Sequence, residues 1–175
     1  MLPLNADRLE AFKIQRRFMN VNQLRVTRMK ESLASHQQIF FHVLPLLFHA
    51  NHSLMPGYLS KDCPSGVSDY SSNAATLRAA RKLAKSFSMR KGVVYQVAGH
   101  STYLMGSSGS IAQSNDNDFE LWLCHRPELS EAALKLLRRK AQAVESWAAD
   151  LGLEVHFFLM SARVLNPEQS SSCRV

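Results

Sequence analysis

The segment from residue 119 to residue 160 constrains the fold most, because it holds the clearest helix of the chain between two strand candidates. Apolar side chains recur on one helical face between residues 130 and 151. They are Leu134, Leu137, Ala141, Val144, Ala148 and Leu151. Ser130 is the expected N-cap, and Gly152 stands where a helix C-terminal glycine belongs. With "FELWLCH" before it and "LEVHFFLM" after it, this segment predicts strand, helix, strand.

The preceding residues add two strand candidates and three helices. "VVYQVAG" and "TYLMG" come before a Gly/Ser stretch, so the second half of the chain reads strand, turn, strand, helix, strand. Helical apolar patterns cover 6–34, 37–49 and 73–89. Asn73 is the expected N-cap of the last of these, and residues 51–72 form a loop. Pro45 predicts a kink or a break near His42 to Leu44.

Together these elements predict an α+β fold, with a helical N-terminal part packed beside a small sheet. We expect a helical region over 1–90, a sheet-containing region over 91–165 and an unstructured tail over 166–175. An apolar content of 46% with 20% charged residues is ordinary for a globular protein with one core.

The charge balance favours anionic partners. The formal net charge is +7 and the isoelectric point is about 9.6, which suits nucleotides, nucleic acids or acidic membrane surfaces. The chain lacks a Lys/Arg tract interleaved with aromatic residues, so nucleic acid is not the expected partner. The longest apolar run, "IFFHVLPLLFHA", is too short to span a bilayer.

The cysteines and the N-terminus both suit a cytoplasmic protein. Cys63, Cys124 and Cys173 are too widely spaced for a disulfide framework or a zinc motif, and they fit a reducing compartment. The first residues lack the layout of a secretory signal. We therefore expect a soluble protein of the cytoplasm.

An acidic pair marks the start of the strand candidate "FELWLCH". Asp118 and Glu120 are two residues apart, so on a strand both side chains point to one face while Phe119 and Leu121 point into the core. Neighbouring carboxylates repel each other unless a cation lies between them, and Mg²⁺ prefers oxygen ligands. The alternative is an exposed strand edge whose charges discourage pairing with other chains.

The Gly/Ser stretch before this pair suits a phosphate. Gly106 lets the backbone approach a ligand closely, and Ser107 and Ser108 add hydroxyl groups to the backbone N–H groups of the turn. A triphosphate held there would bring its Mg²⁺ to the two acids. The alternative is a flexible linker.

Two further residues join this candidate site. Glu154 is the acidic residue of "LGLEVHFFLM", and it meets the first two acids if its strand lies beside "FELWLCH". The alternative is a strand-end charge that reaches solvent. Trp122 shares the strand face of the acids, where it either packs beside a nucleotide or belongs to the core.

The pattern of these residues resembles a known superfamily. The motif begins with an apolar residue, Gly and Ser, here Met105-Gly106-Ser107. About ten residues later it continues with acid, apolar, acid, apolar, here Asp118-Phe119-Glu120-Leu121. This motif is similar to that of the polymerase-β-type nucleotidyltransferases. "YLMGSSGSIAQSNDNDFELWLCH", "NHSLMPGYL" and "KAQAVESWAADLGLEVHFFLM" resemble the N-terminal catalytic region of class I bacterial adenylate cyclases. So does "NVNQLRVTRM" with the apolar helix after it, and the likeness runs from about residue 9 to residue 160.

The resemblance implies a small sheet of the nucleotidyltransferase type and conversion of ATP to 3′,5′-cyclic AMP and pyrophosphate. It implies two Mg²⁺ ions, or Mn²⁺, held by Asp118, Glu120 and Glu154. Gly106, Ser107 and Ser108 would bind the β and γ phosphates, and the family position that matches Trp122 is also a Trp. Family members are much longer, which implies a regulatory region or effector site outside this chain.

One departure and two alternatives remain. The family usually reads Ser-Asp-x-Asp where this chain reads Asn117-Asp118-Phe119-Glu120, which keeps the charge but lengthens one acidic arm. The same metal site would also serve a nucleotidyltransferase acting on an RNA, a protein or a small molecule. A non-catalytic nucleotide-binding or interaction module is the third hypothesis.

Overall fold

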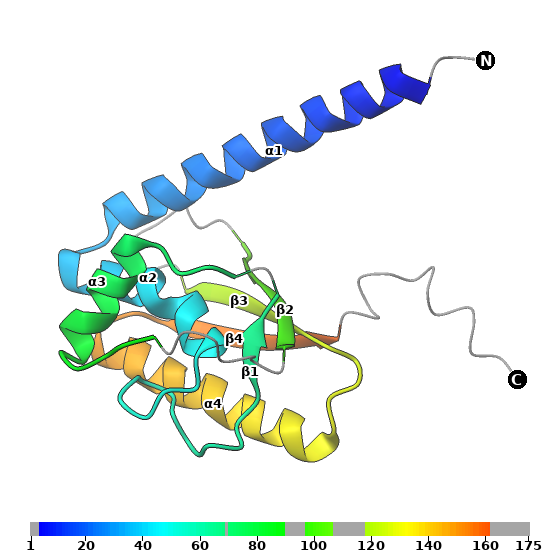
Figure 1. Cartoon of the computed structure of the whole chain (residues 1–175). Coiled ribbons are helices and arrows are strands. Elements are labelled where there is room, and N and C mark those ends of the chain that lie inside the picture. Colours follow the sequence, from blue (N-terminus) through cyan, green and yellow to red (C-terminus); the bar gives the residue numbers. More distant parts are fainter. Residues whose placement is uncertain (1–3, 69, 90–96, 107–117, 162–175) are drawn as a thin grey trace, which may run out of the picture. The chain divides into compact units, whose positions relative to one another are not determined.

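A computed structural model describes residues 4–68, 70–89, 97–106 and 118–161. The chain divides into two compact units. Helix α1 (Leu4–Ser32) belongs to the first unit, and the second, which starts at Ser35, holds the other helices and all the strands (Figure 1). The three-part division expected from the sequence remains a prediction, and the expected tail lies outside the described residues.

Helix α1 confirms the helix expected over residues 6–34. Its apolar residues do not gather into one stripe, and many of them are exposed: Leu9, Phe12, Ile14, Phe18, Met19, Val21 and Leu24. Among the helices within the described ranges, none has the length and apolar character needed to cross a membrane.

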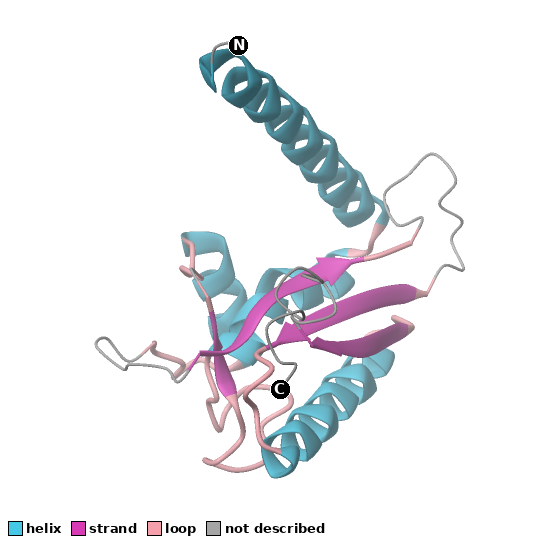
Figure 2. Cartoon of the chain, turned by 90° about the vertical axis from the view of Figure 1, so that its right-hand side faces the viewer, coloured by secondary structure: helices cyan, strands magenta, loops and turns pink. Residues whose placement is uncertain are grey.

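The second unit is built on a four-stranded mixed sheet (Figure 2). Its strands lie in the order β1 (Ser65–Val67), β2 (Val97–Leu104), β3 (Phe119–His125) and β4 (Val155–Ser161). β1 is parallel to β2, β2 is antiparallel to β3, and β3 is parallel to β4. Helix α4 (Glu131–Asp150) provides the crossover that two parallel neighbours require. The predicted α+β class and the strand–helix–strand order are confirmed.

Both ends of α4 follow the predicted capping chemistry. The backbone N–H of Ala133 donates to the Ser130 hydroxyl at 3.2 Å, which satisfies one free donor of the first turn. At the other end Gly152 has a φ of 71°, a left-handed conformation that glycine adopts without a side-chain clash. The N–H of Leu153 then donates to the Ala148 carbonyl at 3.0 Å. These caps set where β4 begins, and so where Glu154 lies.

Helices α2 (Ser35–His49) and α3 (Ala74–Leu83) complete the second unit. α2 continues through Pro45, so the helix has no break near residues 42–44. Burial explains this, because the helix is held by its packed apolar side chains: Phe40, Val43, Leu44, Leu46, Leu47 and Phe48. In α3, Asn73 is the predicted N-cap and accepts the Thr76 N–H at 2.8 Å, but the helix ends at Leu83 instead of residue 89.

The strands also differ in part from the sequence prediction. β1 lies inside residues 51–72, which were expected to be loop because of their prolines and glycines, Pro64 and Gly66 among them. It exists because Ser65 and Val67 pair with β2, a contact distant in sequence. The described part of the two strand candidates before the turn is one strand, β2, and residues 90–96 lie outside the described part of the chain.

The core lies between one face of the sheet and helices α2 and α4. Phe119 and Leu121 are 4% and 2% exposed and point to this side. Three aromatic pairs join the layers: Phe41 with Phe119, Phe48 with Phe157, and Phe40 with Trp147. Full burial of such a ring, as for Phe40, Phe48 and Phe119, stabilises the fold by roughly 1.5–3 kcal/mol. Side chains at the alternate positions of β3 and β4 therefore point to the opposite face of the sheet. We call it the open face, because its side chains Glu120, Trp122, His156 and Phe158 are partly or fully exposed.

Candidate active site

The pairing of β3 with β4 brings the predicted acids to one end of the sheet. Asp118 immediately precedes β3 and Glu154 immediately precedes β4. The Phe119 N–H donates to the Glu154 carbonyl at 2.8 Å, which fixes the two strand starts side by side. Further along, Glu120 pairs with His156. The strand after α4 thus lies beside "FELWLCH", which is the condition under which Glu154 was expected to meet the other two acids.

The acidic side chains lie on the open face of the sheet. Phe119 and Leu121 are buried against the helices, whereas Asp118 and Glu154 are exposed and Glu120 is partly exposed. This is the alternation that the spacing predicts for a half-buried strand. The core holds the backbone of β3 in place, so the direction of its acidic side chains is set by packing.

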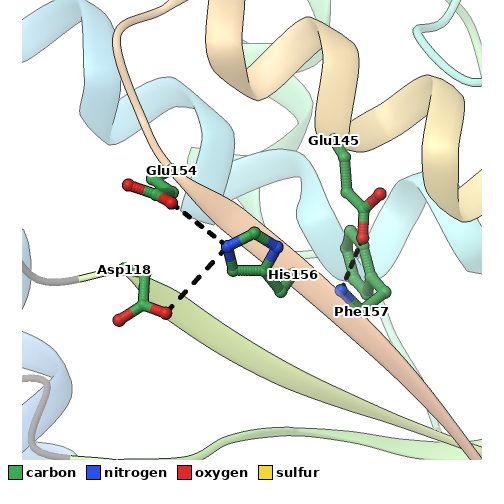
Figure 3. Close-up of polar contacts among 5 residues, drawn as sticks. All are labelled: Asp118, Glu145, Glu154, His156 and Phe157. Carbon is green, nitrogen blue, oxygen red and sulfur yellow. Dashed lines mark hydrogen bonds and ion pairs between the residues drawn. The ribbon is translucent and has the colours of Figure 1, made fainter.

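His156 lies between two of the acids, and the sequence analysis missed it (Figure 3). Its Nε2 atom is 3.4 Å from Glu154 Oε1 and 4.0 Å from Asp118 Oδ2. Residues 154 and 156 are two apart on one strand, which is the same signal that grouped Asp118 with Glu120. Alternation along β4 therefore groups His156 with Glu154, whereas its approach to Asp118 depends on the pairing of β3 with β4.

The Gly/Ser turn begins beside Glu120. The Met105 N–H donates to the Glu120 carbonyl at 2.8 Å. Gly106 follows with a φ of 75°, and a Cβ atom added there would lie 3.9 Å from Glu120 Oε2. Gly106 and Glu120 are thus neighbours. Ser107 and Ser108 lie outside the described residues, so their phosphate-binding role stays a prediction.

Three aromatic residues form a row across the open face. Trp122 pairs with Tyr103 on β2 and with Phe158 on β4, so all three point the same way. Tyr103 is 51% and Phe158 is 45% exposed, and Trp122 is partly exposed. The row lies two residues beyond Glu120, about 6.6 Å along the strand. The predicted facing of Trp122 is confirmed, whereas its contact with a nucleotide stays a prediction.

The donor chemistry of this face suits a divalent metal ion. Three carboxylates share it, and across the described ranges none of them forms an ion pair with a lysine or arginine. Oxygen donors of this kind are the ligands of Mg²⁺ in proteins. In the described part of the chain, no three His, Cys, Asp or Glu side chains already surround a common metal position. The chemistry of the donor set fits the ion, and the side chains would have to move closer together to hold one.

Comparison with known proteins gives the family. The family described as Adenylate cyclase NT domain matches residues 10–174. The chain is 34% identical over 167 residues to the adenylate cyclase of Salmonella typhimurium strain LT2, and 33% identical over 161 residues to that of Escherichia coli K12. The adenylate cyclase of Pasteurella multocida is 31% identical over 164 residues. No solved structure matches the chain.

These matches cover nearly all of the chain but a small part of each relative. They span 91% of this chain for the Salmonella and Escherichia proteins and 88% for the Pasteurella protein, against 19% of each relative's length. The matched residues include the acidic pair, the Gly/Ser turn, α4 and β4. The chain therefore belongs to the family of adenylate cyclase N-terminal domains.

Proposed function

We propose that the chain supplies metal-binding and phosphate-binding residues of an adenylate cyclase, which converts ATP to 3′,5′-cyclic AMP and pyrophosphate in the cytoplasm. The observation that carries this proposal is the placement of Asp118, Glu120 and Glu154 at one end of the same sheet face, with Gly106 beside Glu120. The relatives named above are adenylate cyclases, which agrees with this assignment.

The acids have distinct roles in the proposed reaction. Asp118 and Glu120 would hold two Mg²⁺ ions, or Mn²⁺, and Glu154 would complete the first metal site. When bound, these ions supply charge neutralisation at the ribose 3′-hydroxyl and at the leaving pyrophosphate. Glu154 also has a carboxylate oxygen free to accept the 3′-hydroxyl proton, because its side chain is exposed at the strand start.

The turn and the aromatic row would position the nucleotide. The backbone at Gly106 with Ser107 and Ser108 would hold the β and γ phosphates next to Glu120. Trp122 would then contact the nucleoside part, since it lies two residues beyond Glu120 on the same face of β3. Positioning of this kind contributes on the order of 7–11 kcal/mol to lowering the barrier of such a reaction.

The chain spans 19% of the length of its relatives, so regulation and any protein effector are assigned to regions outside the matched part. Two other functions share the same metal site. A nucleotidyltransferase would pass the nucleotidyl group to a separate acceptor, and a non-catalytic module would bind nucleotide without chemistry.

Incubation of the chain with ATP labelled at the α-phosphate and Mg²⁺ tests the proposal. Cyclic AMP that disappears in Asp118→Asn is the expected product, at a low turnover because the chain spans 19% of the length of its relatives. Label on an added RNA, protein or small-molecule acceptor would assign a nucleotidyltransferase instead. Metal-dependent binding without any product would assign the binding module, and the absence of binding would contradict all three.

A further inference from the structure

We infer that His156 is a ligand of the metal site and makes that site prefer Mn²⁺ to Mg²⁺. The inference rests on the proposed function, because it uses the same acids. It adds a nitrogen donor to what the sequence presents as an all-oxygen site. His156 projects from β4 on the open face, directly opposite Glu120 in the strand register.

One of the two distances around His156 matches the separation of neighbouring ligands of one ion, and the other is slightly longer. For metal–ligand bonds of about 2.1 Å, two neighbouring donors are about 3.4 Å apart in a tetrahedral site and about 3.0 Å apart in an octahedral one. The His156 Nε2 atom is 3.4 Å from Glu154 Oε1 and 4.0 Å from Asp118 Oδ2 (Figure 3). The first pair already has the required separation, and the second needs to close by several tenths of an ångström.

The side chains have the freedom to close this gap. Asp118 is 52%, Glu154 70% and His156 48% exposed, so none of them is locked by core packing. In the described ranges, the imidazole of His156 makes polar contacts with these two carboxylates. This accounts for the absence of a ready-made metal position among the residues that the structure describes, because these side chains lie near one another without enclosing a common point.

A nitrogen ligand changes which cation the site selects. Mg²⁺ demands near-octahedral oxygen donors and keeps much of its water, whereas imidazole is a good ligand for first-row transition metals. A site with Asp118, Glu154 and His156 therefore binds Mn²⁺ more tightly than Mg²⁺. A site with oxygen ligands alone would distinguish the two ions only weakly. The identity of residue 156 becomes the determinant of cation preference.

Replacement of the nitrogen donor by an oxygen donor tests this directly. In His156→Gln the side-chain amide reaches about as far as Nε2, so the number of donors is kept and their type changes. Mn²⁺ binding to the 175-residue chain is measured by electron paramagnetic resonance of the free ion, and Mg²⁺ binding by its competition. His36→Gln, at an exposed position of α2, is the matched control, and circular dichroism checks the fold of each variant.

We expect the unaltered chain to bind Mn²⁺ at least about tenfold more tightly than Mg²⁺, and His156→Gln to lose about tenfold in Mn²⁺ affinity while Mg²⁺ affinity changes less than about twofold. His36→Gln should bind both ions as the unaltered chain does. Equal Mn²⁺ affinity in His156→Gln and the unaltered chain, with binding lost in Asp118→Asn, would overturn the role of His156 and leave the proposed metal site standing. No binding of either ion to the unaltered chain would overturn both.

Discussion

Replacement of Lys140 should make the fold more stable, because this lysine is buried in the second unit. Its side chain lies on α4 with 1% exposure, and Nζ is 5.9 Å from the centre of the Phe48 ring. Burial lowers the pKa of Lys140 from 10.5 to about 8, and the nearby Cys63 thiol opposes this only in part. The folded state therefore carries the ammonium group at a cost that the unfolded chain does not have.

The size and the pH window of this cost follow from the two pKa values. Below about pH 8 the lysine is charged in both states, and the folded state bears the full cost. The cost disappears as pH rises from about 8 to 10.5, so this group raises stability with pH across that window. The difference between 10.5 and about 8 corresponds to roughly 3 kcal/mol at about 1.36 kcal/mol per pH unit.

Lys140→Met keeps most of the side-chain volume and removes the charge. The lost cation–π contact with Phe48 offsets about 0.5–2 kcal/mol, so the variant should be about 1–3 kcal/mol more stable at pH 7. Urea unfolding of both proteins from pH 7 to 10.5 measures this difference, which should shrink toward or below zero as pH rises. Lys135→Met, at an exposed position of the same helix, should show no such trend.

Burial also raises the pKa of Cys63, Cys124 and Tyr70, which lowers stability at alkaline pH. Cys124 and Tyr70 contribute equally to both proteins. Cys63 is coupled to Lys140, whose charge lowers the Cys63 pKa, so the difference between the proteins at alkaline pH includes this coupling as well. A stability difference that stays constant from pH 7 to 10.5, or a methionine variant less stable at pH 7, would refute the reasoning.

Three further substitutions test the acids and the elements that position them. Glu120→Asp should keep Mg²⁺-dependent ATP binding while Glu120→Gln loses it, because charge and not length is the requirement; equal calorimetric affinities of the two variants would contradict a metal-binding role. Glu145→Ala should cost about 1.5–3 kcal/mol in urea unfolding, because the Phe157 N–H donates to the Glu145 carboxylate at 2.6 Å; Glu145→Gln, which keeps an acceptor, should cost less. Gly152→Ala should cost about 1–2 kcal/mol because of its φ of 71°, and a neutral thermal shift would mean that the α4 cap does not need glycine.

The parts of this fold that depend on neighbours in sequence could be predicted from it. The caps at Ser130 and Gly152 set the limits of α4, and the alternation of Asp118, Phe119 and Glu120 gave the facing of the acids. Each of these rests on residues no more than a few positions apart, where backbone geometry alone relates the side chains.

The parts that depend on distant pairing could not be predicted. β1 is defined by its register with β2, some thirty residues away, and its own three residues carry little strand signal. The approach of His156 to Asp118 needs the register of β3 with β4. Likewise α2 continues past Pro45 because the surrounding core holds it, which a local rule on proline does not include.

Calorimetric titration of the chain with ATP, in the presence and absence of Mg²⁺, tests the central claim most directly. The unaltered chain should bind ATP with an affinity that depends on Mg²⁺, and Asp118→Asn should lose that dependence while its circular dichroism is unchanged. Asp62→Asn, which neutralises an exposed carboxylate in the loop between α2 and β1, should behave as the unaltered chain does. Undiminished Mg²⁺-dependent binding in Asp118→Asn would contradict the assignment of the open face of β3 and β4 as the metal and nucleotide site.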